Sequence, residues 1–146
     1  METRNPDYRE AVARLIEIAP FIRELGMRLT GVGPGWCETA LDLGPRHEQQ
    51  DGYVHAGVIA TVADHTAGSA ATSVVAPNEY ILSAEFKINF LRAARGKRLT
   101  CRAKVLKPGR TLVVVESEVY VEDETGTRMT AKALLTMAVL QRGESA

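Results

Sequence analysis

The chain has 146 residues, of which 45% are hydrophobic and 25% are charged, and its 18 basic residues balance 18 acidic ones. These values are typical of one folded domain and exclude the disordered and fibrous classes of protein. A formal net charge of zero argues against a surface devoted to nucleic acid or to anionic membranes. We therefore expect a single domain over residues 1–146, with no nucleic-acid partner and no membrane partner.

The two cysteines, Cys37 and Cys101, are far apart and belong to no Cys-X-X-Cys or Cys/His pattern. The sequence therefore predicts neither a metal site nor a disulfide framework. The first residues are polar and lack the apolar stretch of a secretory signal, so we expect a cytoplasmic protein. Residues 54–76 are apolar enough to mimic a membrane span, but Asp64 and two histidines within them favour a core helix.

The N-terminal segment, Asp7 to Leu25, has a helical spacing of apolar residues that Pro20 should interrupt. We expect an amphipathic helix there, followed by a short turn. Glycines then mark a turn between two expected strands, Gly26 to Thr30 and Trp36 to Leu43. The polar, turn-rich residues 44–53 are typical of an exposed loop, which leads into the next element.

One long helix is expected from about Ala56 to Val75, and the pattern then changes to period two. This change predicts a half-buried strand over residues 82–90. Three more strands are expected at 99–105, 111–121 and 129–139, joined by turn sequences. The apolar side of the first of these four strands should hold Leu82, Ala84, Phe86, Ile88 and Phe90.

The order of elements lacks the strand-helix alternation of a doubly wound sheet. It predicts an α+β fold in which a curved antiparallel sheet wraps around the long central helix. The helix is rich in alanine, glycine, serine and threonine, and small side chains allow a curved sheet to approach closely.

The central helix carries one carboxylate, Asp64, among small apolar residues. Burying an ionised carboxylate is costly unless a partner stabilises it, so two explanations stay open. In the first, Asp64 pairs with a basic or hydroxyl group or lies on a wetted face of the helix. In the second, Asp64 is a general base or nucleophile in a cleft or at a subunit interface.

The residues that precede the helix favour the second explanation. A helix start presents unpaired backbone N–H groups, which can bind an anion or a developing oxyanion. Asp64 lies eight residues beyond Ala56. That is about 12 Å along an ideal helix, farther than one carbonyl group reaches. If two subunits pair across a two-fold axis, the carboxylate of one can face the helix start of the other.

Residues 55–64, HAGVIATVAD, resemble the HGGxxxxLaD signature of hotdog-fold acyl-CoA thioesterases of the PaaI type, which are related to 4-hydroxybenzoyl-CoA thioesterases. Residues 87–96, KINFLRAARG, similarly resemble the NFLRPA..G strand and turn of that family. With the order of strands, the likeness spans residues 26–140. It leaves 1–25 as an N-terminal helix and lead-in and 141–146 as a tail.

The resemblance implies a hotdog fold and an enzyme that hydrolyses an acyl-CoA, with aromatic or medium-chain acyl groups as candidates. It also implies sites shared between the subunits of a homodimer that assembles into a homotetramer. No cofactor is implied, because CoA is part of the substrate. The resemblance does not define the acyl group, the pathway or the packing of the tetramer.

Carried over by position, Asp64 is the catalytic carboxylate, acting as a nucleophile or as a base toward water. The backbone N–H of Ala56 or Gly57 is the oxyanion donor. Gln49 would orient the thioester or the water, and His55 would hold the loop or contact the thioester. Ala56 stands where the family commonly has glycine, which a backbone donor tolerates unless the residue is left-handed.

Other residues are candidates for substrate binding. Gln50 is an alternative to Gln49, and Asn89 lies in the matching strand. Some relatives align the attacking water with a hydroxyl group on the helix after the acid, and the candidates here are Thr66, Ser69, Thr72 and Ser73. A basic cluster between two strands could bind the phosphates of CoA, although such clusters are more often solvated turns. It consists of Arg92, Arg95, Lys97 and Arg98, with Lys107 and Arg110 as further candidates.

Three alternatives compete with a thioesterase. A dehydratase or hydratase normally pairs a histidine with an acid, and the pattern offers no clear pair. The others are a non-catalytic acyl-CoA-binding or regulatory protein, and a structural oligomeric domain in which Asp64 forms a salt bridge. His65 projects about 100° around the helix from Asp64, so we expect it to be structural, and His47 is expected to be a plain loop residue.

Overall fold

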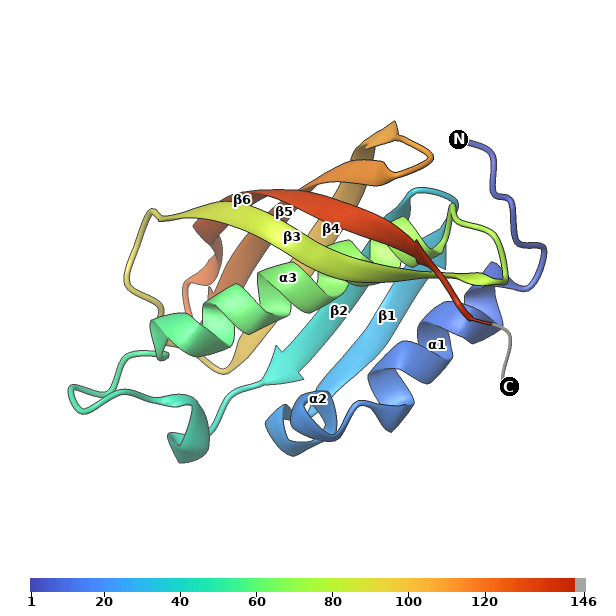
Figure 1. The fold of residues 1–146 in the computed structure, drawn as a ribbon. Helices are drawn as coiled ribbons and strands as arrows, with labels where there is room; N and C mark the ends of the chain where they lie inside the picture. The colour runs from blue at the N-terminus through green and yellow to red at the C-terminus, as the bar shows by residue number, and fades with distance from the viewer. Residues whose placement is uncertain (144–146) are drawn as a thin grey trace.

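The computed structural model describes residues 1–143, in which a six-stranded antiparallel sheet curves around one long helix (Figure 1). The helices are α1 (Tyr8–Ile18), α2 (Pro20–Leu25) and α3 (Ala56–Thr72), with a 3-10 turn, η1 (Pro45–His47). The strands are β1 (Met27–Gly33), β2 (Trp36–Asp42), β3 (Glu79–Phe90), β4 (Arg98–Pro108), β5 (Leu112–Asp123) and β6 (Gly126–Gln141). The predicted α+β arrangement, a sheet wrapped around one helix, is confirmed.

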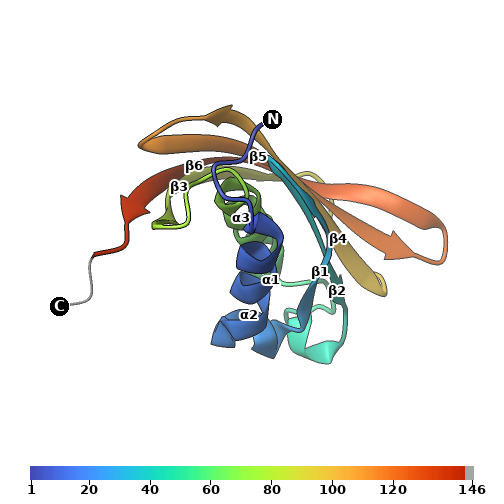
Figure 2. The same cartoon turned by 90° about the vertical axis from the view of Figure 1, so that its right-hand side faces the viewer.

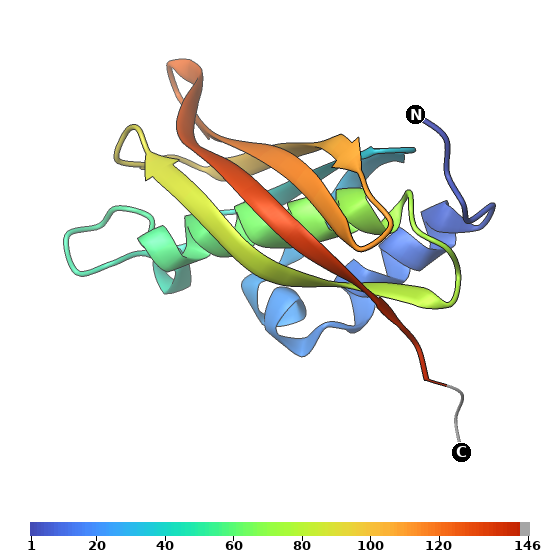
Figure 3. The ribbon, with the colours of Figure 1, turned by 45° about the horizontal axis from the view of Figure 1, so that its top comes forward.

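The strands lie in the order β1-β2-β4-β5-β6-β3, so β3 and β1 form the two edges of the sheet. The pairs β1–β2, β4–β5 and β5–β6 are each joined by a short turn, whereas α3 separates β2 from β3. Figure 3 shows β6 and β3 crossing the molecule side by side above α3. Because β3 pairs only with β6 within residues 1–143, the other edge of β3 presents unpaired backbone groups.

The N-terminal segment folds as two helices because of Pro20. A proline lacks the N–H that a continuing helix needs, but it fits the first position of a new helix, where Pro20 begins α2. Gly26 then ends α2 in the left-handed conformation, with φ of 84°. Val12 and Ile16 of α1 are buried against the rest of the molecule, where α1 packs on β1 and α3.

The long helix begins at Ala56 as predicted and ends at Thr72, earlier than Val75, because residues 73–75 form a turn. It lies in the hollow of the curved sheet and packs on β2, β3, β4 and β5, with α1 on another side (Figure 2). Val62 and Ala67 are fully buried. None of the helices within residues 1–143 is long and apolar enough to span a membrane.

Three hydrogen bonds fasten α3 to the sheet. The hydroxyl groups of Thr66 and Thr39 lie 2.7 Å apart, and the Ser117 hydroxyl donates to the Ala63 carbonyl over 2.9 Å. Near the end of α3, the Gly35 N–H in the β1–β2 turn donates to the Ser73 hydroxyl over 2.8 Å. Since all these hydroxyl groups are buried, each bond satisfies a group that would otherwise be costly to bury.

The strict alternation predicted for residues 82–90 is wrong at Ala84. A bulge there shifts the register of β3 against β6 between Ser83 and Glu85. Ser83 pairs with Met137 and Phe86 with Leu135, so both side chains face α3, while Leu82 lies on the opposite face. A bulge adds one residue without a partner, which is why residues three apart share a face here.

Candidate active site

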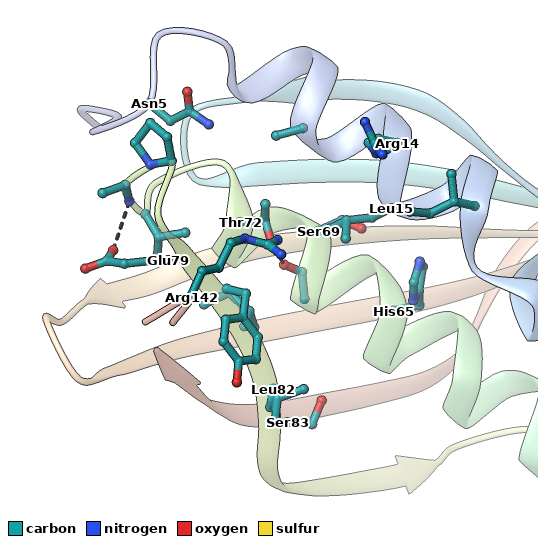
Figure 4. A pocket seen from close by; sticks show the side chains of 18 of the residues that line it. Asn5, Arg14, Leu15, His65, Ser69, Thr72, Glu79, Leu82, Ser83 and Arg142 are labelled. Atoms are coloured by element: carbon teal, nitrogen blue, oxygen red, sulfur yellow. Dashed lines mark hydrogen bonds between the residues drawn. The ribbon is translucent and has the colours of Figure 1, made fainter. Parts of the chain in front are cut away.

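A cavity of about 690 Å³ lies between α1, α3 and the first half of β3 (Figure 4). Asp64 of α3 and Ser83 of β3 lie at one end, and Asn5 and Glu79 lie at the other. Leu15 of α1 forms part of the wall. Its volume is in the range of small-molecule binding sites, and its lining mixes apolar and polar groups as such sites do.

The Asp64 carboxylate is half-buried at the cavity, and the Ser83 hydroxyl donates to its Oδ1 atom over 2.5 Å. A hydrogen bond to a charged oxygen is stronger than one between neutral groups and fixes the carboxylate in one orientation. Within residues 1–143, no hydrogen bond involves Oδ2. The bulge at Ala84 places Ser83 on this face, so the irregular strand serves the site directly.

His65 also lines the cavity, which the sequence reasoning missed when it treated this residue as structural. Its Nε2 atom is buried and has no hydrogen-bond partner among the described residues. Burial lowers the pKa of His65, while the Asp64 charge and the Leu15 carbonyl partly oppose this effect. The ring is therefore neutral near pH 7. A signal was present in the sequence, since helix positions four apart share a face and residues 64, 65, 68 and 69 all contact the cavity.

The start of α3 is capped by His55. Its Nδ1 atom accepts a hydrogen bond from the Gly57 N–H over 2.8 Å, so this predicted oxyanion donor is already engaged. Ala56, the first residue of α3, is exposed, and its N–H forms no hydrogen bond with another described residue. A first-turn N–H has no acceptor within the helix, so Ala56 provides the free donor at this end.

Gln49 lies in the loop that precedes α3 and turns back on that loop. Its side-chain oxygen accepts hydrogen bonds from the backbone N–H groups of Asp51 and Tyr53, and its amide nitrogen donates to the Asp51 carboxylate. Gln50 is exposed and also donates to Asp51. Within the described chain, neither side chain forms a hydrogen bond with Asp64.

Two residues brace this loop. His47 is buried, with its Nδ1 accepting from the Gly44 N–H and its Nε2 2.8 Å from the Leu25 carbonyl. Arg95 donates to the backbone carbonyls of Asp51 and Gly52, and its guanidinium lies 4.5 Å from the centre of the Tyr53 ring. His47 is thus a structural anchor rather than a plain loop residue.

A model of the family described as Thioesterase superfamily matches residues 51–127, more than half of the chain. The chain belongs to the thioesterase superfamily. A thioesterase family protein from Silicibacter pomeroyi has a similar structure at 35% identity, with a TM-score of 0.90 over 92% of this chain and 98% of that one. A Haemophilus influenzae thioesterase shares the fold at 22% identity, with a TM-score of 0.84 over 99% of this chain and 98% of that one.

A 1,4-dihydroxy-2-naphthoyl-CoA hydrolase from Listeria monocytogenes is 27% identical over 69% of this chain and 80% of its own length. These likenesses confirm the resemblance to hotdog thioesterases, the hotdog fold and the class of thioester hydrolase.

Most of the basic residues proposed for CoA are engaged within this thioesterase. Arg92 donates to the Met129 carbonyl, Arg98 pairs with Asp42, and Lys97 lies 3.6 Å from Glu122. All three contacts lie at the surface, where they leave much of each charge exposed. Arg110 and Lys107 are exposed near the β4–β5 turn.

Two other predicted substrate-binding residues of this thioesterase lie away from the cavity. Asn89 pairs with Lys132 on the outer face of the sheet and accepts a hydrogen bond from Lys87. Thr66 is fully buried and bonds to Thr39 and to the Val62 carbonyl, so its hydroxyl group is committed to the core.

Within residues 1–143 of this thioesterase, no cluster of three histidine, cysteine, aspartate or glutamate side chains is arranged to hold a metal. Both cysteines are buried and free, and burial raises the pKa of each thiol to about 12. Such thiols are protonated and unreactive at neutral pH.

Proposed function

We propose that this thioesterase hydrolyses acyl-CoA thioesters in the manner of the PaaI type, with aromatic or medium-chain acyl groups as substrates and Asp64 as the catalytic carboxylate. The observation that carries this proposal is the state of Asp64. One of its oxygens is held by Ser83 at the end of a cavity, and the other has no partner within the described chain. A carboxylate that is oriented but not neutralised is suited to attack or to proton removal.

The proposed reaction breaks the C–S bond of the thioester. Asp64 removes a proton from water, which adds to the carbonyl carbon, or Asp64 itself adds to that carbon and the resulting anhydride is hydrolysed. The oxyanion formed in this step accepts a hydrogen bond from the N–H of Ala56 at the positive end of α3. Collapse of the intermediate expels CoA thiolate, which takes a proton, and the free acid leaves.

Ala56 and Asp64 of one chain are about 12 Å apart along α3, so we propose that each site combines Asp64 of one subunit with Ala56 of another. The unpaired edge of β3 supports this arrangement. Phe86 and Phe90 face the α3 side of the sheet yet remain 42% and 48% exposed, as expected for residues that a second copy covers. We propose a homodimer through β3, a homotetramer of two such dimers, and action in the cytoplasm.

The catalytic proposal is tested by measuring the release of free thiol from a panel of acyl-CoAs. We expect Asp64→Asn to lower kcat by about 100-fold or more while the protein stays folded, because a catalytic group is lost. Asp7→Asn makes the same chemical change at an exposed residue with no side-chain capping bond and should leave kcat unchanged. Equal turnover by the Asp64→Asn variant would remove Asp64 from the mechanism. Binding of acyl-CoAs without turnover by the unmodified protein would instead identify a regulatory binder.

The shared site is tested by complementation between two inactive variants. Ala56→Pro removes the N–H at the first position of α3, where proline is tolerated, and the extended His55 suits a following proline. When this variant and Asp64→Asn are unfolded together and refolded as a mixture, half of the dimers contain one of each. Each such dimer holds one intact shared site, so activity should return to about a quarter of normal. No recovery, with dimers present, would place the whole site within one subunit.

A further inference from the structure

The cavity beyond Asp64 contains polar atoms that the protein itself leaves unsatisfied. Within residues 1–143, the buried side-chain atoms without a hydrogen-bond partner are His65 Nε2 and Ser69 Oγ, and both residues line this cavity. Ser69 is only 1% exposed. The Ser69 hydroxyl lies beside the Cys37 sulfur and lowers the pKa of that thiol, but sulfur is a weak acceptor. An unsatisfied buried polar atom lowers stability, so two at one cavity point to a ligand that completes them.

Gly68 leaves the cavity open between these residues and Asp64. It lies one turn beyond Asp64 on the same face of α3 and also lines the cavity. A Cβ atom placed on Gly68 would meet no heavy atom within 4 Å. The protein therefore has room for a side chain at this position and carries none. The bare backbone gives a passage from the carboxylate toward the deeper part of the cavity.

The imidazole and hydroxyl groups of the cavity are neutral. The pKa of His65 is lowered by burial, so its ring carries no charge near pH 7, and the hydroxyl groups of Ser69 and Thr72 are uncharged. Apart from Asp64, the charged side chains that line the cavity are either open to water or already paired. Arg14 and Arg142 are exposed, and Glu79 is paired with Arg4 over 2.6 Å. A purely alkyl group would leave the buried polar atoms unsatisfied, and a charged group would lose its hydration beside partners that are neutral.

We propose that the acyl group of the substrate enters this cavity across Gly68 and carries a neutral hydroxyl group that forms hydrogen bonds with His65 and Ser69. This inference rests on the proposed acyl-CoA hydrolysis and assigns the residues that select the acyl group. His65 and Ser69 are selectivity residues, since neither takes part in breaking the thioester. Ser69 lies five residues beyond Asp64, which corresponds to about 7.5 Å along the helix.

The passage is tested with side chains of increasing size at position 68. Gly68→Leu should obstruct the route and lower kcat/KM for hexanoyl-CoA about tenfold or more, and it should lower that for acetyl-CoA, whose acyl group is too short to cross the passage, far less. Gly68→Ala is the matched control, because a single methyl group adds little bulk and alanine favours a helix. It should lower kcat/KM for hexanoyl-CoA much less than Gly68→Leu does, and it should raise the melting temperature. An unchanged ratio of hexanoyl-CoA to acetyl-CoA hydrolysis in folded Gly68→Leu protein would overturn the route.

The hydrogen bonds are tested with hexanoyl-CoA and 6-hydroxyhexanoyl-CoA, which differ only in a hydroxyl group at about the required distance. We expect the unmodified enzyme to prefer the hydroxylated substrate about tenfold in kcat/KM, because sites built around a hydroxyl group discriminate against its absence. Ser69→Ala and His65→Phe should each reduce this preference, and the double variant should abolish it. In the free protein Ser69→Ala loses only the weak contact with the Cys37 sulfur, so its stability should change little.

The outcomes separate this inference from the proposed function. If the unmodified protein hydrolyses hexanoyl-CoA but treats the two substrates alike, the hydroxyl-binding role is wrong and the acyl-CoA hydrolase stands. A preference that persists in the double variant would place the selecting residues elsewhere. If no acyl-CoA of the panel is hydrolysed, the proposed function itself fails. Should His65→Phe not fold, Ser69→Ala alone still decides, through its kcat/KM ratio for the two substrates.

Discussion

The two sides of helix α3 differ in whether their polar groups have hydrogen-bond partners within the protein. On the side facing the sheet, Thr66 bonds to Thr39, and the Ala63 carbonyl accepts from Ser117. On the side facing the cavity, Asp64 has one oxygen without a hydrogen bond, and His65 Nε2 is unpartnered within the described chain. Both sides belong to one helix of 17 residues, so composition does not explain the difference.

The contrast separates groups that hold the fold from groups that await a ligand. Thr66 and Ser69 are neighbouring hydroxyl residues, and both are buried almost completely. Thr66 has two partners, the Thr39 hydroxyl and the Val62 carbonyl, whereas Ser69 Oγ has none among the described residues. A buried hydroxyl group normally has a hydrogen-bond partner. The presence or absence of such a partner therefore distinguishes structural from functional roles here better than burial does.

The largest effect on stability is expected on the sheet side. Leu135 of β6 is fully buried on the face that packs on α3, and Leu135→Ala should lower the free energy of unfolding by about 2–5 kcal/mol through lost contacts and a cavity. Leu134→Ala is a matched control on the opposite face, where the side chain is 50% exposed, and should change stability by about 0.5 kcal/mol or less. Urea denaturation measures both. Similar losses would show that the α3 side of the sheet is not the main core.

A smaller effect is expected from the threonine pair. Thr66→Val leaves the Thr39 hydroxyl buried without this partner, which should lower the free energy of unfolding by about 1–3 kcal/mol. In the Thr39→Val/Thr66→Val double variant no hydroxyl group is left unsatisfied at this contact, so its stability should lie closer to the original than the sum of the single changes. Strict additivity in chemical denaturation would contradict a direct bond between the two groups.

Much of this contrast was predictable from the sequence, up to a definite point. The apolar run of α3 and the single carboxylate within it predicted both the helix and Asp64, because an acid among small apolar residues needs a stabilising partner or a function. The strand at residues 82–90 was predicted correctly from its period of two, but the face on which Leu82 and Ser83 lie was predicted wrongly. The bulge of β3 at Ala84 depends on pairing with β6, which no local pattern encodes.

The partners of the site residues could not be predicted because they depend on contacts between distant segments. His65 became part of the cavity wall through the packing of α1 beside α3. Arg95, expected near CoA phosphates, bonds to the loop at Asp51 and Gly52, more than forty residues earlier in the chain. The engagement of Gly57 by His55 is local, yet it depends on the rotamer of the histidine, which the sequence does not specify.

On the cavity side, Ser83→Ala should lower kcat about tenfold with a smaller change in KM, because Asp64 loses the hydroxyl group that orients it. Ser83→Thr keeps a hydroxyl group and should restore most of kcat. Steady-state kinetics with one acyl-CoA substrate measures these values. An unchanged kcat in the alanine variant would mean that the carboxylate needs no orientation by Ser83. The Asp64 carboxylate would then not differ from a polar group that simply lacks a hydrogen-bond partner.

The smallest effect is expected at Glu79. It lines the far end of the cavity, yet its carboxylate has hydrogen-bond partners within the protein, as the hydroxyl groups on the sheet side of α3 do. Burial alone would raise the pKa of Glu79, but the Ala76 N–H and the Arg4 guanidinium outweigh it and hold the pKa below its ordinary value of 4.5. Because the folded-state pKa is the lower one, the ionised carboxylate stabilises the protein above pH 4.5, and this contribution is lost as the pH falls through the folded-state value.

The melting temperature of the original protein should therefore exceed that of Glu79→Gln at pH 7, and the gap should close as the pH falls below about 4.5. The preference for 6-hydroxyhexanoyl-CoA over hexanoyl-CoA should be the same in both proteins, since Glu79 is already bonded to Arg4, Ala76 and Gln141. A gap that is independent of pH would exclude a role for the ionised carboxylate. A changed preference would mean that Glu79 also helps to select the acyl group. The presence of a hydrogen-bond partner within the protein would then no longer separate structural from functional residues in this molecule.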